Sequence, residues 1–369
     1  MLLLPLLMLL RRHQARRQLG YFRQSLTATG RRRRDRRIKR ISLTAPSISP
    51  FTVLVGFGCD QSLITFTGLD HRAFRSLLAL FSQFYDRFTP YSTSGFIRQR
   101  SVSAMGRPRS LDSTSCLALA LAWTRTRGST MVLCMLFGIT SSVCSLYLRF
   151  GRRLLVRTLV KNSDAEIRLP TQEEVQGFKR AFAAKYSMLD DVWAVADGLK
   201  IYLEQAGDTV IQNMFYNGWT HDHYVGNVLV FAPNGTICAA AINAPGAMHD
   251  SQIADWGNVY GKLEDVFVRF GGRCIVDSAF AKGDYPFLIK SSQDMPITSD
   301  PRDVIRARQA TSARQAAEWG IRAVQGSFPR VKDRMIYEQR GERKVILQMI
   351  MLLFNYRTRL VGLIQILAN

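Results

Sequence analysis

The hydrophobic pattern of the chain changes near residue 191, and this change constrains the fold more than any other feature. Before it, apolar residues recur at three- and four-residue intervals, as in 70–88, which predicts helices. After it, short apolar runs rich in β-branched residues alternate with helical patterns, which predicts a mixed α/β domain. The predicted elements are, in order, strands 192–196, 224–231 and 236–242, helix 251–267, strand 273–276 and helix 303–325.

Three carboxylates stand at defined places in this pattern. Asp197 and Asp277 each end an apolar strand, and Glu318 lies in the long helix. Strand ends are rigid and lie at the open edge of an α/β sheet, where ligands bind. Three strands, a helix, a strand and further helices make up the order of a ribonuclease H-like α/β fold.

Such a carboxylate cluster needs a counterion. Three carboxylates within a few ångströms would repel by about 4 kcal/mol per pair at an effective dielectric constant near 20, so the cluster persists only if it is protonated or neutralised. Oxygen ligands select hard ions such as Mg²⁺ or Mn²⁺. Two such ions about 3.5–4 Å apart can activate a water or a 3′-hydroxyl and stabilise the leaving oxygen of a phosphodiester.

The charge of the chain is strongly positive and uneven. Its 50 Lys and Arg against 28 Asp and Glu give a net charge of +22. Residues 1–190 hold 31 basic and 10 acidic side chains, a net +21, whereas residues 191–369 hold 19 and 18, a net +1. This balance argues against a generic cytosolic metabolic enzyme and predicts a polyanionic partner for the first half. Six scattered cysteines predict buried thiols in a reducing compartment, without a disulfide framework or a structural zinc site.

Residues 1–49 are predicted to be a basic leader. Met1–Leu10 is too short for a transmembrane helix, and its arginines follow the apolar run, unlike those of a secretory signal. No membrane partner is expected. The run Arg31–Arg40 repels itself, so no packed structure is expected before about Pro50. We interpret it as a nuclear-import signal or a phosphate-binding arm, with a merely solvated tail as the alternative.

Residues 50–160 are predicted to be an all-α DNA-binding domain. Helices are expected over 113–125, over 131–137 and from about residue 141, after a flexible basic lead-in at 106–109. A helix, a glycine-containing turn and a basic helix form a helix-turn-helix arrangement; a three-helix packing unit with a solvated basic face is the alternative. Residues 161–190 are predicted to be a linker with a helix, leading to a catalytic domain over 191–369. The candidate DNA-binding residues here are Arg107, Arg109, Arg149, Arg152, Arg153 and Arg157.

Four segments of the second half carry a resemblance to a known family. They are Ala196–Gly198 (ADG), Asn243–Ser251 (NAPGAMHDS), Val276–Phe280 (VDSAF) and Arg314–Gly320 (RQAAEWG). In order, with the acidic residues 80 and 41 positions apart, they resemble the DDE transposases of the PIF/Harbinger type. The segments 328–332 and 354–362 are similar to the tail of that family. The third segment departs from the family's Gly-Asp-Ser-Gly-Tyr-like sequence but keeps the acidic residue.

The resemblance implies a ribonuclease H-like nuclease that cuts and rejoins transposon ends with two Mg²⁺ ions, or Mn²⁺ in their place. Asp197, Asp277 and Glu318 would be catalytic and hold the ions. Asp250 would be a further metal ligand or the N-cap of the next helix. Arg314 and Arg322 could hold Glu318 by ion pairs or reach DNA phosphates. The resemblance also implies a nuclear protein acting on double-stranded DNA at terminal repeats and target sites, and it allows a Myb-like helper protein and a homo-oligomer.

Other interpretations stay open. A domesticated or inactive copy would bind DNA without cutting it, and a different ribonuclease H-like nuclease would cut without preferring terminal repeats. His221 and His223 flank Asp222, which admits a zinc site, although a lone H-x-H is more often surface. His249 could orient Asp250, contact a phosphate or pack in the core.

Overall fold

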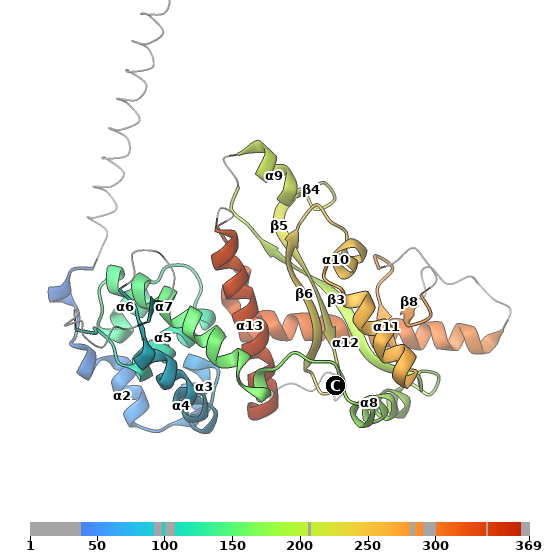
Figure 1. Ribbon diagram of the computed structural model, residues 1–369, viewed down its shortest axis with the longest axis horizontal. Helices are drawn as coiled ribbons and strands as arrows, with labels where there is room; N and C mark the ends of the chain where they lie inside the picture. Colours follow the sequence, from blue (N-terminus) through green and yellow to red (C-terminus); the bar gives the residue numbers. More distant parts are fainter. Residues whose placement is uncertain are drawn as a thin grey trace, which may run out of the picture.

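The structure, a computed structural model, describes residues 38–91, 98–99, 108–205, 208–280, 285–290, 300–336 and 339–362. For 98–99 only the backbone is described. Residues 1–37, with most of the predicted leader, and Arg107, a predicted DNA contact, lie outside the described residues. A helical part and a part built on a sheet lie side by side along the long axis of the molecule (Figure 1).

The helical part follows the apolar and capping residues of the sequence. Asp70 accepts a hydrogen bond from the Ala73 N–H and begins α4, and Asp112 does the same for α5. Gly138 ends α6 in the left-handed conformation, with φ of 62°. The four helices predicted here are confirmed as α4 (His71–Arg87), α5 (Ser113–Arg125), α6 (Met131–Phe137) and α7 (Ser141–Val160). The structure adds two helices that were not predicted, α2 (Pro50–Gly56) and α3 (Asp60–Thr67), and the short strands β1 (Phe88–Thr89) and β2 (Arg98–Gln99).

Packed structure begins earlier than predicted. Two 3₁₀ turns, Arg40–Ser42 and Pro46–Ile48, precede α2. Arg40 donates to the Gly138 carbonyl at 2.7 Å, and Ser49 caps α2. The expectation of no packed structure before Pro50 is wrong for residues 40–49, because an arginine of the run finds a backbone acceptor on the folded helices.

The sheet has the strand order expected of the predicted fold. In the described residues the order is β6–β5–β3–β7–β8, with β4 beside the start of β5. β3 pairs antiparallel with β5, and β5 with β6, whereas β7 and β8 run parallel to β3. This mixed sheet, flanked by helices, is consistent with a ribonuclease H-like domain. The strands are β3 (Val192–Tyr202), β4 (Tyr216–Asn217), β5 (Asp222–Phe231), β6 (Ile237–Pro245), β7 (Arg273–Val276) and β8 (Leu288–Lys290).

Two elements of the sheet part differ from the predicted ones. β3 continues five residues past Asp197, because Leu199 and Ile201 keep a buried two-residue alternation. Asp197 therefore lies inside the strand, and the prediction that it ends the strand is wrong. The predicted helix 251–267 is two helices, because Asn258 adopts a left-handed φ of 53° between them. They are α10 (Asp250–Trp256) and α11 (Val259–Phe270).

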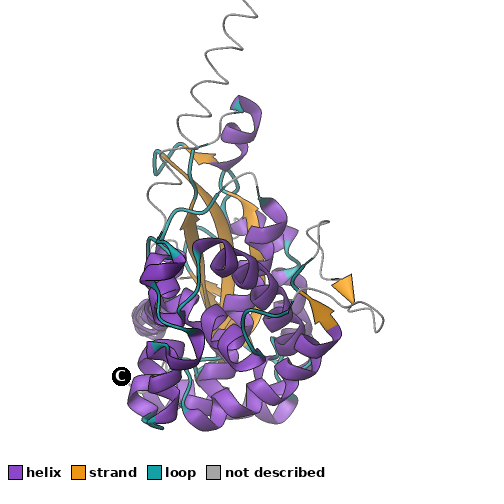
Figure 2. Ribbon diagram, turned by 90° about the vertical axis from the view of Figure 1, so that its left-hand side faces the viewer, coloured by secondary structure: helices purple, strands orange, loops and turns teal. Residues whose placement is uncertain are grey.

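Helices cover both faces of the sheet (Figure 2). α12 (Pro301–Ser327) and α13 (Arg340–Val361) pack on the face that carries Val195 and Leu229, and α11 packs on the face that carries Ala194 and Val230. α8 (Gln172–Lys185), predicted as part of a linker, also packs on β3 and buries Val175 against the sheet. α9 (Thr209–Phe215) and α13 were not predicted as elements. α13 is buried on nearly every side between 349 and 358, so it has no apolar stripe that periodicity could reveal.

α13 joins the two parts of the molecule (Figure 1). The Tyr356 hydroxyl donates to the Ala73 carbonyl in α4 at 2.8 Å. One residue earlier, the Asn355 side chain accepts from the Ile237 N–H at 2.8 Å and donates to the Ile237 carbonyl at 2.9 Å. One continuous hydrophobic core runs from α2 to α13. The helical part and the sheet part therefore share a core.

No single helix in the described part of the chain is long and apolar enough to cross a membrane. α6 and α7 together have the required length and composition, but they bend by 92° at the turn between them.

Candidate active site

Asp197 lies in β3, and Asp277 directly follows β7, the parallel strand beside it. Val195 of β3 pairs with Ile275 of β7, and each aspartate follows its strand's paired residue by two positions. Neighbouring strands are about 4.8 Å apart, so continuing this register brings both aspartates to the same level of the sheet. Each carboxylate accepts a hydrogen bond from the next backbone N–H, at 2.7 Å for Asp197 and 2.8 Å for Asp277.

Asp250 approaches this pair from α10. Its carboxylate lies directly against Gly198 of β3, where an added β-carbon would come within 2.4 Å of Asp250 Oδ2. Only glycine lets the carboxylate approach the strand so closely. His249 is the N-cap of α10, and Asp250 is the first helical residue. The alternative that Asp250 is the N-cap is therefore wrong.

Burial and neighbouring carboxylates raise the pKa values of Asp197 and Asp250. Burial raises the pKa of Asp197 to about 6; the charges of Asp250 and Asp277 add to this rise, and Arg314 opposes it. Burial likewise raises the pKa of Asp250, which Lys200 lowers and Asp277 raises further. Negatively charged carboxylates thus face one another at a half-buried site, an arrangement that added positive charge would stabilise.

Glu318 reaches the same region from α12, which packs against β3 and β7. Arg314 Nη2 lies 3.0 Å from Glu318 Oε1, and Arg314 Nη1 lies 3.9 Å from Asp277 Oδ1. Arg322 Nη2 lies 3.7 Å from Glu318 Oε2, so both predicted ion pairs are confirmed. In the described residues, no three His, Cys, Asp or Glu side chains are placed to hold one metal ion together. Arg314 stands between Asp277 and Glu318 as their shared counterion.

The sequence analysis missed one residue of this region, Lys200. Its ammonium lies 5.4 Å from the centre of the Tyr224 ring and lowers the pKa of Asp250. Gly198 and Lys200 are two residues apart on β3 and share a face of the sheet. Recognising that β3 continues past Asp197 would have placed Lys200 beside Asp250.

The predicted helix-turn-helix pair exists as two helices, α6 and α7, but α7 is buried over most of its length against α5 and α13. Its exposed residues near the N-terminus are Ser142, Ser145 and Arg149. DNA contact by this pair stays a prediction.

The arginines predicted to bind DNA lie in different surroundings. The guanidinium of Arg109 lies 4.1 Å from the centre of the Tyr85 ring, and that of Arg157 lies 4.7 Å from the Phe88 ring. Arg109 also donates to the Phe88 carbonyl at 2.8 Å, which gives it a structural role.

Arg149, Arg152 and Arg153 lie close together on α7. Arg152 and Arg153 both pair with Glu342 at the start of α13, Arg152 at 3.8 Å. Arg149 is exposed and makes no hydrogen bond or ion pair with the residues that the structure describes.

The two histidines of the H-x-H segment do not share a strand face. His221 lies in a left-handed turn before β5, with φ of 52°, whereas His223 is buried within β5. Asp222 between them pairs with Arg334 at 2.7 Å. No metal-binding cluster in the described part of the chain includes them. Five of the six cysteines are buried, as predicted, and Cys59 is exposed.

Residues 196–355 match the family model of the DDE superfamily endonucleases. The chain carries a DDE superfamily endonuclease domain. The matched range contains all four carboxylates of the site and reaches into α13, so the DDE domain includes both the strands that hold the aspartates and the helix that holds Glu318. No curated protein and no solved structure matches the chain. A DDE domain is a nuclease domain that acts on DNA, and nucleases of this family generally use divalent metal ions.

Adding a methyl group to Gly198 tests the close approach of Asp250. Gly198→Ala is expected to lower DNA cleavage about 10- to 100-fold, because its β-carbon would displace the Asp250 carboxylate by an ångström or more. Cleavage of a labelled duplex in Mg²⁺ measures the effect. Gly177→Ala in α8, where nothing lies within 4 Å of the new carbon, is the control and should cleave like wild type. Equal rates for both variants would show that Asp250 is not needed at this position.

Neutralising Asp197 should stabilise the metal-free protein. Because its folded-state pKa of about 6 lies above the ordinary 3.8, the folded chain binds the proton more tightly than the unfolded chain. Stability is therefore lost as pH rises from about 4 through about 6, and it stays lower above this range. Asp197→Asn removes this loss, so its free energy of unfolding at pH 8 in EDTA should exceed that of wild type by up to about 3 kcal/mol. Urea unfolding at pH 8 and pH 4 checks the sign, with little difference at pH 4; a less stable variant at pH 8 would contradict the prediction.

Proposed function

We propose that this protein is a DNA transposase of the PIF/Harbinger type, which cleaves phosphodiester bonds at the ends of a DNA element and transfers the cut strands to a target. The observation that carries the proposal is the register of the parallel strands β3 and β7, in which Val195 pairs with Ile275 two residues before Asp197 and Asp277, within a domain that matches DDE endonucleases. Asp250 and Glu318 flank this pair from α10 and α12.

The chemistry of these side chains fits hard divalent cations. All four are oxygen donors, which suit Mg²⁺ and Mn²⁺. Burial, and secondarily neighbouring carboxylates, raise the pKa values of Asp197 and Asp250, so a cation beside them would be stabilising. We propose that Asp197, Asp277 and Glu318 hold two ions, with Asp250 as a further ligand. For Glu318 to join them, Arg314 has to release it.

The chain's own residues would prepare the reaction. Divalent ions at these carboxylates would supply a water or 3′-hydroxyl of lowered pKa and positive charge for the leaving oxygen. Asp197 and Asp277 are held by the strands and by their backbone hydrogen bonds, so little reorganisation is needed. Arg314, once it leaves Glu318, can donate to a phosphate oxygen beside Asp277.

The partners follow from charge and from the family. The net charge of +21 over residues 1–190 favours double-stranded DNA, which would be the element's terminal repeats and the target. We further propose that the protein acts in the nucleus, as a homo-oligomer and together with a Myb-like helper protein.

The test uses the gene's own flanking DNA. Terminal inverted repeats beside the gene provide a labelled duplex, which the purified chain should cleave at the repeat ends in Mg²⁺ and not in EDTA, followed by joining to a second duplex. Cleavage without preference for repeats would indicate another ribonuclease H-like nuclease. Binding without cleavage in Mg²⁺ or Mn²⁺ would contradict the nuclease proposal and favour a domesticated DNA-binding protein.

A further inference from the structure

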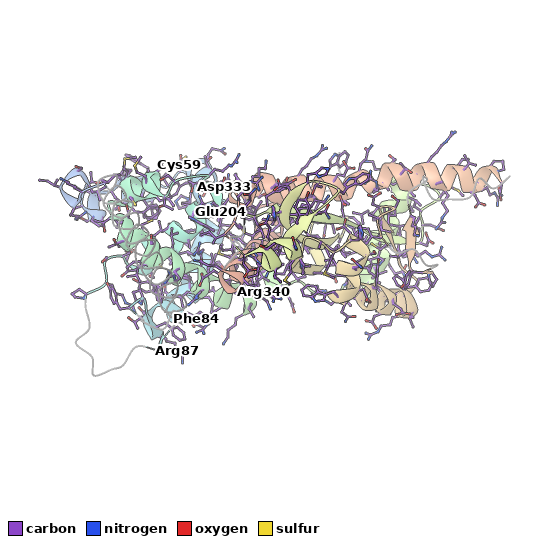
Figure 3. The ribbon with its side chains drawn as sticks, turned by 90° about the horizontal axis from the view of Figure 1, so that it is seen from above. Cys59, Phe84, Arg87, Glu204, Asp333 and Arg340 are labelled. Carbon is purple, nitrogen blue, oxygen red and sulfur yellow. The ribbon has the colours of Figure 1, made fainter. Side chains whose placement is uncertain are left out.

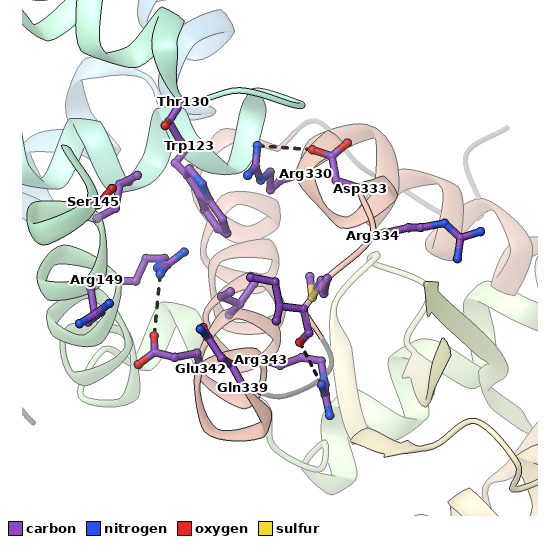
Figure 4. Close-up of a pocket in the computed structure, with 15 residues that line it drawn as sticks. Trp123, Thr130, Ser145, Arg149, Arg330, Asp333, Arg334, Gln339, Glu342 and Arg343 are labelled. Carbon is purple, nitrogen blue, oxygen red and sulfur yellow. Dashed lines mark hydrogen bonds and ion pairs between the residues drawn. The ribbon is translucent and has the colours of Figure 1, made fainter. Parts of the chain in front are cut away.

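A pocket of about 280 Å³ lies where the helical part meets α13 and the chain before it. Figure 4 shows Trp123 and Arg149 on the helical side facing Arg330 and Arg343 on the other side. Five arginines line the pocket, against two carboxylates. The arginines are Arg149, Arg152, Arg330, Arg334 and Arg343, and the carboxylates are Asp333 and Glu342.

Of the two carboxylates of the pocket, Asp333 is fully engaged, whereas Glu342 is bound through one oxygen and its buried Oε2 has no hydrogen-bond donor among the described residues. Asp333 accepts from Arg127 at 2.9 Å and from the Gly128 N–H at 2.7 Å, and it lies 3.4 Å from Arg330. Glu342 forms a short hydrogen bond with Arg153, which does not line the pocket. Positive charge in the pocket therefore exceeds negative charge.

Arg152 packs on the Trp123 ring and has one hydrogen-bond donor, its Nε–H, that is not used by any described residue. Its guanidinium lies 4.5 Å from the centre of the Trp123 ring, and Arg330 lies 4.8 Å from the same ring. Its contact with Glu342 is 3.8 Å long, beyond hydrogen-bond distance. Its Nε is buried and has no hydrogen-bond acceptor among the residues that the structure describes. A buried donor without an acceptor is unfavourable, so an oxygen acceptor in the pocket would be stabilising.

The anion nearest to Arg152 is Glu342, which it shares with Arg153. Burial lowers its pKa to about 10; Glu342 opposes this shift, while Arg330 and Arg149 strengthen it. Guanidinium groups bind phosphate oxygens with paired hydrogen bonds, and neutral hydroxyls and amides commonly complete a phosphate site. Thr130, Ser145 and Gln339 of the pocket offer such groups.

We infer that this pocket binds a phosphate of the DNA backbone between the helical part and the DDE domain, with Arg149 and Arg152 on α7 and Arg330 on the opposite side as its ligands. This inference rests on the proposed action on DNA and adds a contact that lies away from the carboxylates. A phosphate held there would fix the duplex to both parts of the molecule at once. The contact involves only the DNA backbone, so its contribution to affinity would not depend on the base sequence of the DNA.

The test measures DNA affinity of the full chain in EDTA, where cleavage plays no part. Fluorescence anisotropy with two labelled duplexes of unrelated sequence gives the affinity between about 50 and 200 mM salt. Arg149→Gln, at an exposed position, is expected to weaken binding equally on both duplexes and to lower the slope of log K against log salt by about 1. Ser145→Glu adds a carboxylate to the pocket wall at an exposed position and should weaken binding further.

The matched control is Arg87→Gln. Arg87 ends α4 at the edge of the helical part (Figure 3). It lies away from the boundary between the two parts, where Arg340 begins α13. Arg87 is exposed and does not line the pocket, so its variant should keep the wild-type slope. Wild-type slopes for both Arg149→Gln and Ser145→Glu, or an equal loss in Arg87→Gln, would overturn the inference. Absence of salt-dependent binding in the wild type would instead count against the proposed action on DNA.

Discussion

Asp277→Asn should lower the rate of Mg²⁺-dependent DNA cleavage at least about 1,000-fold, with DNA affinity in EDTA within about twofold of wild type. The substitution keeps the shape of the side chain and removes one of the two charges that follow the paired residues Val195 and Ile275 by two positions. Because Asp277 also lies 3.9 Å from Arg314, loss of its charge leaves that guanidinium with Glu318 alone. Gel analysis of a labelled terminal-repeat duplex measures the rate.

The control for this prediction is Asp255→Asn. Asp255 lies on α10, five residues after Asp250, and its side chain is exposed. The same change of charge outside the carboxylate cluster should leave cleavage within about twofold of wild type. Asp277→Asn with undiminished cleavage would remove Asp277 from the active site. Equal losses in both variants would mean that overall charge, not the cluster, governs the rate.

Asn355→Leu is expected to lower the free energy of unfolding by about 3–5 kcal/mol. The fully buried Asn355 side chain accepts from the Ile237 N–H and donates to the Ile237 and Glu166 carbonyls. Leucine fills a similar volume but removes the side-chain partner of the Ile237 N–H and carbonyl, at about 1–3 kcal/mol each, whereas the Glu166 carbonyl keeps its hydrogen bond from Arg359. Urea unfolding followed by circular dichroism measures the loss.

Asn213→Leu, on the exposed face of α9, is the matched control and should change stability by less than about 0.5 kcal/mol. Because α13 contributes to the core of both parts, the Asn355 variant should still unfold in one transition. Two separate transitions in the wild-type protein would contradict the shared core.

The sequence was sufficient to predict those structural features that local interactions determine. Asp70 and Asp112 accept from N–H groups three residues ahead, and Gly138 takes the left-handed turn that ends a helix, so these helix boundaries could be predicted. The predicted order of strands and helices also placed the acidic residues in one domain. That order needs only short-range periodicity and the alternation of strands and helices.

The sequence was insufficient where tertiary contacts decide. Asp197-Gly198 has the composition of a turn, yet pairing with β5 carries β3 through it to Tyr202. α13 is buried on nearly all sides, so its helix gives no periodic signal. The contact of Arg314 with Asp277 depends on how α12 packs over β7. No local sequence pattern encodes this packing.

Binding of Mn²⁺ to the full chain tests the central claim most directly, because the signal of free Mn²⁺ in electron paramagnetic resonance falls as the ion is bound. The account predicts that wild type and Asp255→Asn each bind two ions per chain and that Asp277→Asn loses at least one of them. Wild type and Asp277→Asn with the same Mn²⁺ stoichiometry and affinity would contradict a metal site built on Asp197, Asp277 and Glu318.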